Sequence, residues 1–245
     1  MLDHSPLLSD VPGLRHGFSN REGGASSGRY ATLNLGGRWG DDAAAVTENH
    51  ARVAAAGGYA VEQLRRVRQV HGNQVLGMAE LRPDSEADAL WCGRGDHCVA
   101  SVMTADCVPV LLADREGTVA AAVHSGWRGT VANIVGAAVG ALARAGAEPG
   151  SVVAAIGPCI ELAAFEVGQE VAEQFPAQFV DRARWPSPHV DLVAMVREQL
   201  AEAGVPAASV DRVGACTHAN PSQWYSYRRD GAGIGQMLAF AGYPT

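Results

Sequence analysis

Residues 98–124 read CVASVMTADCVPVLLADREGTVAAAVH and contain three short apolar runs. The runs cover residues 98–103, 108–113 and 119–123, and each is shorter than an ordinary helix. Continuous runs of this length, rich in valine and other apolar residues, are typical of strands that are buried on both faces. This stretch therefore predicts three buried strands, with a polar turn at residues 104–107 between the first two.

Similar patterns along the rest of the chain predict the other elements. The predicted strands cover residues 69–78, 98–103, 108–113, 119–123, 152–156 and 210–215. The predicted helices cover residues 42–56, 130–145, 166–175 and 190–203. We expect Asp41 or Asp42 to cap the first helix, Thr130 to cap the second and Gly146 to end it. Strands that alternate with helices, without a linker, predict an α/β (α+β) fold with a mixed sheet and a single domain over residues 1–245.

The composition argues against several classes of function. A net charge of −7 is unfavourable for a general nucleic-acid binder, so no nucleic-acid partner is expected. All 19 basic residues are arginine, which excludes a Schiff-base lysine and a Walker-type phosphate loop. No apolar stretch is long enough for a bilayer, and no signal-peptide pattern is present, so no membrane partner is expected. Five irregularly spaced cysteines indicate a cytoplasmic protein with reduced thiols.

Three potential metal ligands stand at or just past the ends of apolar runs. They are His71, Cys107 and His124. Two imidazoles and one thiolate form a three-ligand set, and zinc enzymes with such a set keep a fourth position open for water or substrate. Each residue also has an ordinary alternative, because a lone histidine is often a structural hydrogen-bonding residue and a free cysteine is often simply buried. If the three side chains meet in space, the sequence predicts a catalytic metal site.

Glycine, aromatic and arginine residues near these ligands predict a substrate pocket. The turn at residues 125–129 precedes a predicted helix, a position that suits an anion. Residues 216–218 and 225–231 follow a predicted strand and combine aromatic rings for stacking with arginines for phosphate. The alternative for these segments is an ordinary turn with surface arginines. The candidate residues for substrate and phosphate are Arg21, Arg128, His218, Tyr227 and Arg228.

These segments, taken in order, resemble the YfiH-like family, which is also called the laccase-domain, multicopper polyphenol oxidase or peptidoglycan-editing-factor family. The matching motifs cover almost the whole chain. They lie at residues 20–24, 30–36, 40–42, 69–72, 87–90, 104–109, 124–130, 156–160, 216–218 and 226–231. One mild difference is Tyr225, where the family usually has phenylalanine or a similar residue.

The resemblance implies mixed β-sheets between helical layers and a zinc ion held by His71, Cys107 and His124, which are then also the catalytic residues. It implies a purine nucleoside enzyme that phosphorolyses adenosine, inosine, guanosine or methylthioadenosine and that deaminates adenosine. Asn34, which lies in one matching motif, joins the candidate substrate residues. The expected partners are a small-molecule nucleoside and phosphate, and the protein is expected to be a monomer or a homodimer.

Two other activities remain open at this point. Copper also suits a set of two histidines and one cysteine, which would give a copper-dependent polyphenol oxidase, although eight histidines without an H-x-H pair do not suggest a multicopper centre. A hydrolase that edits peptidoglycan precursors would use Cys107 as its nucleophile and a histidine as its base. For deamination, Asp106 and His218 are candidate proton shuttles.

Overall fold

Two large mixed sheets form the centre of the computed structural model, which describes residues 1–245. The first sheet has the strand order β1 (Leu2–Asp3), β2 (Arg15–Ser19), β13 (Met237–Gly242), β6 (Val99–Thr104) and β3 (Leu64–Arg65). The second has the order β12 (Val210–Arg212), β9 (Val152–Ile156), β7 (Val108–Asp114), β8 (Val119–Ser125), β5 (Ala89–Gly93) and β4 (Val75–Gly77). Each sheet combines parallel and antiparallel pairs.

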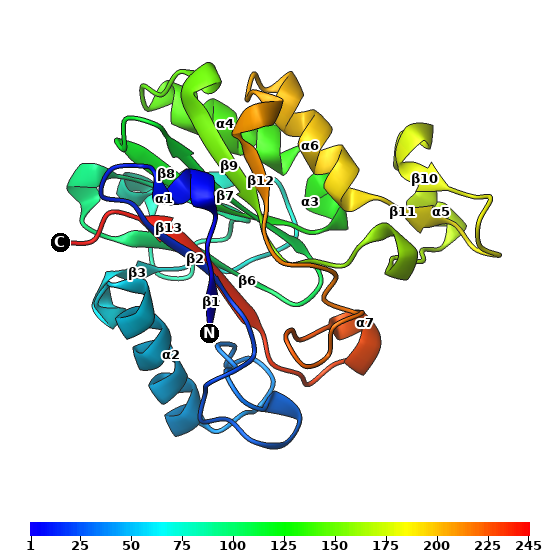
Figure 1. Ribbon diagram of the computed structural model, residues 1–245, viewed down its shortest axis with the longest axis horizontal. Helices are drawn as coiled ribbons and strands as arrows, with labels where there is room; N and C mark the ends of the chain where they lie inside the picture. The colour runs from blue at the N-terminus through cyan, green and yellow to red at the C-terminus, as the bar shows by residue number, and fades with distance from the viewer.

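The two sheets lie between helical layers (Figure 1). Helices α4 (Ile134–Arg144) and α6 (Leu192–Glu202) cover the outer face of the six-stranded sheet. Helix α2 (Ala43–Gly57) covers the outer face of the five-stranded sheet. A third apolar cluster of 21 buried residues fills the space between the sheets. The expected fold class, with mixed sheets between helical layers, is confirmed.

Strand β7 shows why the central strands are apolar throughout. Val108, Val110 and Leu112 pack toward α4 and α6. Leu111 and Ala113 point the other way, into the core between the sheets. Because successive side chains of a strand point to opposite faces, a strand covered on both faces needs apolar residues at every position. The prediction of doubly buried strands is confirmed here.

Two predicted helices differ from the observed ones. The helix predicted over residues 130–145 is divided into α3 (Trp127–Val131) and α4, because Asn133 has φ 57° and its side chain accepts a hydrogen bond from Gly136 N. Thr130 therefore lies inside α3 and caps neither helix. The helix predicted over residues 166–175 is only α5 (Gln169–Ala172), since residue 166 forms an antiparallel bridge with His189 instead.

The strand predicted over residues 69–78 is also wrong for most of its length. Only β4 is a strand, and His71 lies in the preceding loop with φ 61°. The backbone N–H groups of Val70, His71 and Gly72 donate to the Asp88 carboxylate and not to a neighbouring strand. A long-range contact thus replaces the pairing that the local pattern suggested.

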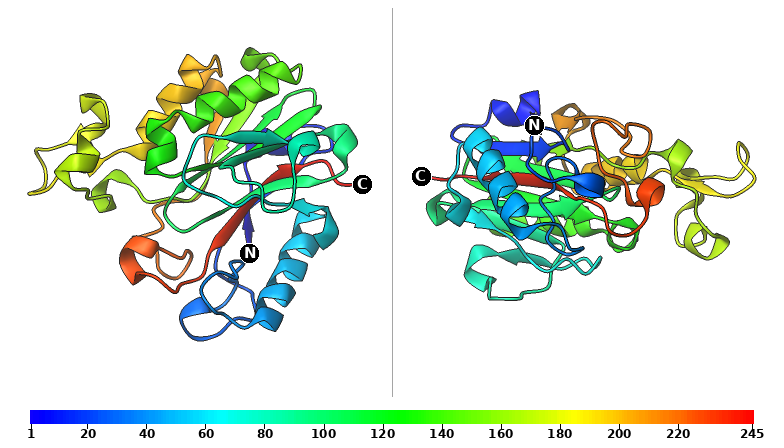
Figure 2. Two further views of the ribbon diagram at one scale, coloured as in Figure 1. Left: turned by 180° about the vertical axis from the view of Figure 1, so that it is seen from behind. Right: turned by 90° about the horizontal axis from the view of Figure 1, so that it is seen from below.

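The remaining α-helices and strands are short. They are α1 (Pro6–Ser9), α7 (Tyr227–Asp230), β10 (Val180–Asp181) and β11 (His189–Val190). Figure 2 shows that α5, β10 and β11 project together from the body of the molecule. Strands β2 and β13, from opposite ends of the chain, pair in one sheet, which supports our proposal that residues 1–245 are a single domain. None of the helices combines the length and the apolar character needed to cross a bilayer.

Candidate metal centre

The three candidate ligands come from neighbouring parts of the six-stranded sheet. His124 is the penultimate residue of β8, and Cys107 directly precedes β7. These strands are antiparallel with Val108 opposite Ser125, so the residues just before β7 and near the end of β8 are neighbours. His71 reaches the same point from the loop before β4. His71 and His124, which are 53 positions apart in the sequence, therefore meet Cys107 at the ends of two central strands.

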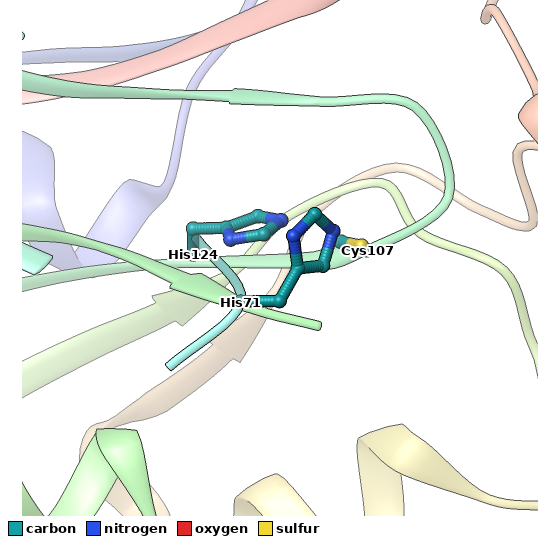
Figure 3. Close-up of side chains that lie close together, drawn as sticks. All are labelled: His71, Cys107 and His124. Carbon is teal, nitrogen blue, oxygen red and sulfur yellow. The ribbon is translucent and has the colours of Figure 1, made fainter. Parts of the chain in front are cut away.

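The ligand atoms of His71, Cys107 and His124 all lie within 4.8 Å of one another (Figure 3). His124 is buried, Cys107 is partly exposed and His71 is exposed, so the cluster opens to solvent on the His71 side. The two imidazole rings are nearly perpendicular, with centroids 4.8 Å apart. Two nitrogens and one sulfur in this arrangement fit a zinc ion with one position left for water or substrate.

The charges of the cluster also suit a metal. Burial disfavours the thiolate of Cys107, but the neighbouring His124 and His71 outweigh this and lower the pKa of Cys107 to about 6. Burial likewise disfavours the imidazolium of His124, yet Cys107 and Asp88 raise the pKa of His124 to about 9. Without metal, the pair is therefore a thiolate and an imidazolium at neutral pH. The thiolate is the form of cysteine that binds metals and acts as a nucleophile.

Gly126 leaves the space in which the three ligands face one another. A Cβ atom at this position would lie 2.9 Å from His71 Cδ2, 3.2 Å from Cys107 Sγ and 3.5 Å from His124 Cε1. The backbone of Gly126 has φ −70°, which any residue adopts, so the glycine is required for space and not for conformation. Any side chain at this position would therefore press on the candidate ligands.

These features lie in a chain whose residues 15–243 match the sequence model of a family described as "Multi-copper polyphenol oxidoreductase laccase". The chain belongs to this laccase family. The match covers every strand except β1, and all three candidate ligands. It also agrees with the family resemblance that the motifs indicated.

Curated relatives of this laccase-family chain carry a different kind of name. A "Purine nucleoside phosphorylase" of Deinococcus radiodurans is 42% identical over 244 residues, covering 98% of this chain and 93% of that protein. "Purine nucleoside phosphorylase YfiH" of Escherichia coli is 38% identical over 241 residues, covering 96% of each chain. The relatives are thus named as nucleoside phosphorylases, while the family description refers to copper.

Two solved structures share the fold of this laccase-family chain. YlmD from Geobacillus stearothermophilus has a TM-score of 0.87 at 28% identity, covering 98% of this chain and 94% of that one. Neisseria meningitidis protein NMB0706 has a TM-score of 0.85 at 32% identity, covering 100% of this chain and 99% of that one.

Two candidate substrate residues have structural hydrogen bonds in this laccase-family fold. The guanidinium of Arg21 donates to the carbonyl oxygens of Ala31 and Pro221 and lies 4.5 Å from the ring centroid of Tyr225. Asn34 is fully buried, and its amide exchanges hydrogen bonds with Gly36 and donates to Asp41. Both side chains join distant loops, and the sequence did not indicate these bonds.

The other candidates are closer to solvent. Arg128 is exposed and lies over the Trp127 ring at 4.3 Å, two residues after Gly126. Tyr227 has 52% of its surface exposed. Arg228 is exposed, and its guanidinium donates to Ala164 O and Glu166 O. His218 is half-buried, and its carbonyl accepts from Arg229.

Asp106 connects this outer group to the candidate ligands. Its Oδ1 accepts a hydrogen bond from Thr217 Oγ1 at 2.6 Å, and its Oδ2 accepts one from Arg228 N at 2.6 Å. Asp106 has φ 94° and directly precedes Cys107. Both carboxylate oxygens thus hold the segment around α7 against the Cys107 turn. This holds the backbone of Arg228 against the turn before Cys107, and each carboxylate oxygen of Asp106 accepts a hydrogen bond.

Proposed function

We propose that this protein is a zinc-dependent purine nucleoside phosphorylase, which cleaves adenosine, inosine, guanosine or methylthioadenosine with phosphate. The observation that carries the proposal is the cluster of His71, Cys107 and His124, open on one side, in a chain 38–42% identical to proteins named purine nucleoside phosphorylase. A small-molecule nucleoside and phosphate are its proposed ligands. We propose a cytoplasmic location for a protein with five free cysteines, as a monomer or a homodimer.

The three ligand side chains have distinct parts in this proposal. His124 and Cys107 come from two adjacent strands and form the rigid side of the site, while His71 forms the solvent side. A bound zinc ion would act as a Lewis acid on a substrate oxygen or on water. Gly126 keeps the space beside the ligands free for the reacting group.

The arginines differ in how much of their charge is available to phosphate. Arg21 donates three hydrogen bonds to two backbone carbonyl groups, and Arg228 uses one nitrogen on two carbonyl groups. Arg128 is exposed and lies two residues after Gly126 in the sequence, and its planar fork of donors suits a phosphate oxygen pair. We propose Arg128 as the main phosphate ligand and Arg228 as a second one. The exposed ring of Tyr227 is proposed to stack on the purine.

The proposal is tested by zinc analysis of the purified chain beside a chromatographic assay with adenosine and phosphate. We expect about one zinc per chain and phosphate-dependent release of adenine. Cys107→Ala should lose both the zinc and the activity. Arg128→Ala should raise the KM for phosphate. The control is Arg197→Ala, which removes an exposed arginine of α6 and should leave this KM unchanged. A wild-type chain with zinc but without base release would contradict phosphorolysis.

Deamination of adenosine is proposed as a second reaction at the same site. A zinc ion held by His71, Cys107 and His124 would lower the pKa of water to about 7 and would so provide hydroxide for attack on a purine carbon. His218 is the better candidate for moving the proton, because both carboxylate oxygens of Asp106 accept hydrogen bonds from Thr217 and Arg228. Formation of inosine from adenosine without phosphate tests this, and His218→Ala should slow it while zinc content stays unchanged.

Two observations are consistent with other chemistries at the same site. The family description names copper, and the ligand set of two histidines and one cysteine accepts copper as well as zinc. Phenol oxidation by copper-loaded protein would favour the oxidase. The lowered pKa of Cys107 beside His124 suits a nucleophilic thiolate, as a hydrolase of peptidoglycan precursors would need. Amide hydrolysis that resists chelators but is lost on thiol alkylation would favour the hydrolase.

A further inference from the structure

One buried carboxylate contacts both candidate histidine ligands. Asp88 directly precedes β5 and is fully buried. Its Oδ1 lies 2.8 Å from His124 Nδ1 and 2.9 Å from His71 N. Its Oδ2 accepts hydrogen bonds from Gly72 N at 2.7 Å and from Val70 N at 3.2 Å. Four donors thus converge on one side chain.

On the His71 side, Asp88 determines the path of the loop. Three consecutive backbone N–H groups, from Val70 to Gly72, surround the carboxylate as an anion-binding nest. His71 has φ 61° in this nest, a left-handed conformation that residues other than glycine rarely adopt. Such a conformation persists only where surrounding contacts hold it. Asp88 supplies these contacts, and they turn the exposed His71 ring toward the other two ligands.

On the His124 side, Asp88 determines which ring nitrogen is free. Because Nδ1 of His124 faces Oδ1 of Asp88 at 2.8 Å, Nδ1 keeps its proton, and Nε2 is the ring nitrogen that can lose its proton and bind a metal. The carbonyl oxygen of Asp88 also accepts a hydrogen bond from His124 N at 2.7 Å. The ring and the backbone of His124 are therefore both fixed by the same residue.

We propose that Asp88 is a positioning residue that holds His71 and His124 together for one metal ion. This inference rests on the zinc site of the proposed function. Histidine ligands of metals generally donate their second ring N–H to such a partner, and loss of that partner weakens metal binding 10–100-fold. Asp88 differs from an ordinary partner in that it also anchors the backbone of a second ligand.

Asp88→Asn tests the proposal with little change of shape. An amide presents one oxygen and one NH₂ group, whereas all four partners of Asp88 are donors, so the NH₂ group must face a donor. If it faces Nδ1 of His124, that nitrogen has to accept, and the proton moves to Nε2, where it blocks the metal. We expect the zinc affinity, measured by competition with a chromophoric chelator, to fall about 10–100-fold.

Asp114→Asn is the matched control. Asp114 is also a buried aspartate that accepts hydrogen bonds from Thr118 N, Thr118 Oγ1 and Val119 N, but it lies at the opposite end of β7 from Cys107. Both variants should lower the thermal stability of the metal-free protein, and only Asp88→Asn should lower the zinc affinity. Equal zinc affinities in the two variants would overturn the positioning role.

Measurements on the wild-type protein distinguish a failure of this inference from a failure of the proposed function. If the wild-type protein binds no zinc, the proposed function fails and the inference fails with it. If Asp88→Asn does not fold, the ring of His124 in zinc-loaded wild-type protein provides the readout by ¹⁵N NMR. A proton on Nδ1 supports the role of Asp88, and a proton on Nε2 overturns it while the zinc site stands.

Discussion

Replacing Gly126 with alanine places one methyl group at the point where the three candidate ligands meet. Carbon atoms in favourable contact are about 3.5–4.0 Å apart. The added Cβ would lie 2.9 Å from His71 Cδ2 and 3.2 Å from Cys107 Sγ, so His71 would have to move by at least about 0.6 Å. Metal–ligand distances tolerate only about 0.2 Å.

The size of the effect follows from this contact. Extra methyl groups in a tightly packed place cost about 1–3 kcal/mol. If this cost falls on the metal-bound arrangement, zinc affinity should fall roughly 5- to 150-fold, since about 1.4 kcal/mol corresponds to a factor of ten. The metal-free protein should keep its stability, because φ −70° suits alanine and the exposed His71 ring has room to move away.

The assay is zinc competition with a chromophoric chelator, with thermal unfolding of the metal-free protein as a second measurement. Gly150→Ala is the matched control, because a Cβ there would meet no atom within 4 Å. We expect Gly150→Ala to bind zinc as the wild type does. A Gly126→Ala protein with wild-type zinc affinity would refute the placement of the metal between His71, Cys107 and His124.

Three further predictions concern other parts of the chain. In metal-free protein, alkylation of Cys107 should reach half its maximal rate near pH 6, and zinc should protect the thiol; a midpoint near pH 9 would contradict the thiolate. Burial and the nearby His4 lower the pKa of His16 from 6.5 to about 4. The neutral form of His16 therefore stabilises the fold above pH 6.5, and this stability is lost as the pH falls through 4. The loss amounts to about 3 kcal/mol, and His16→Gln should remove it from urea unfolding curves measured at pH 7 and pH 4. Asp191 caps α6 by accepting from Ala194 N, so Asp191→Ala should lower the free energy of unfolding by about 1 kcal/mol, and an unchanged urea midpoint would contradict the cap.

The predictions from local pattern succeeded where one face or both faces of an element are simply apolar. The runs at 108–113, 119–123 and 152–156 became β7, β8 and β9 with boundaries within two residues. Helix α2 begins after Asp42, whose side chain accepts from Ala44 N as the cap prediction required. These outcomes depend on side-chain type and spacing within one segment, which a sequence displays directly.

The predictions failed where a side chain, near or distant in the sequence, competes for the backbone. At residues 69–72, three N–H groups bind Asp88, so an apparent strand becomes a loop with a left-handed residue. At Asn133, a side chain that caps the following helix divides one predicted helix into two. Asp88 received no role from the sequence, because a single acidic residue before an apolar run gives no sign of which donors it will meet.

The sequence by itself indicated an α/β fold with a mixed sheet, the absence of lysine chemistry and three candidate soft ligands. These follow from composition and from local apolar patterns, which need no knowledge of the partner segments. Only the tertiary structure decided that the ligand atoms of His71, Cys107 and His124 lie within 4.8 Å, that Arg21 and Asn34 hold loops together and that Arg128 is exposed over the Trp127 ring. The physical reason is that contacts between distant segments decide whether a polar side chain is free to bind a ligand. Arg21, for example, donates to Pro221 O, and such contacts exist only once the chain has folded.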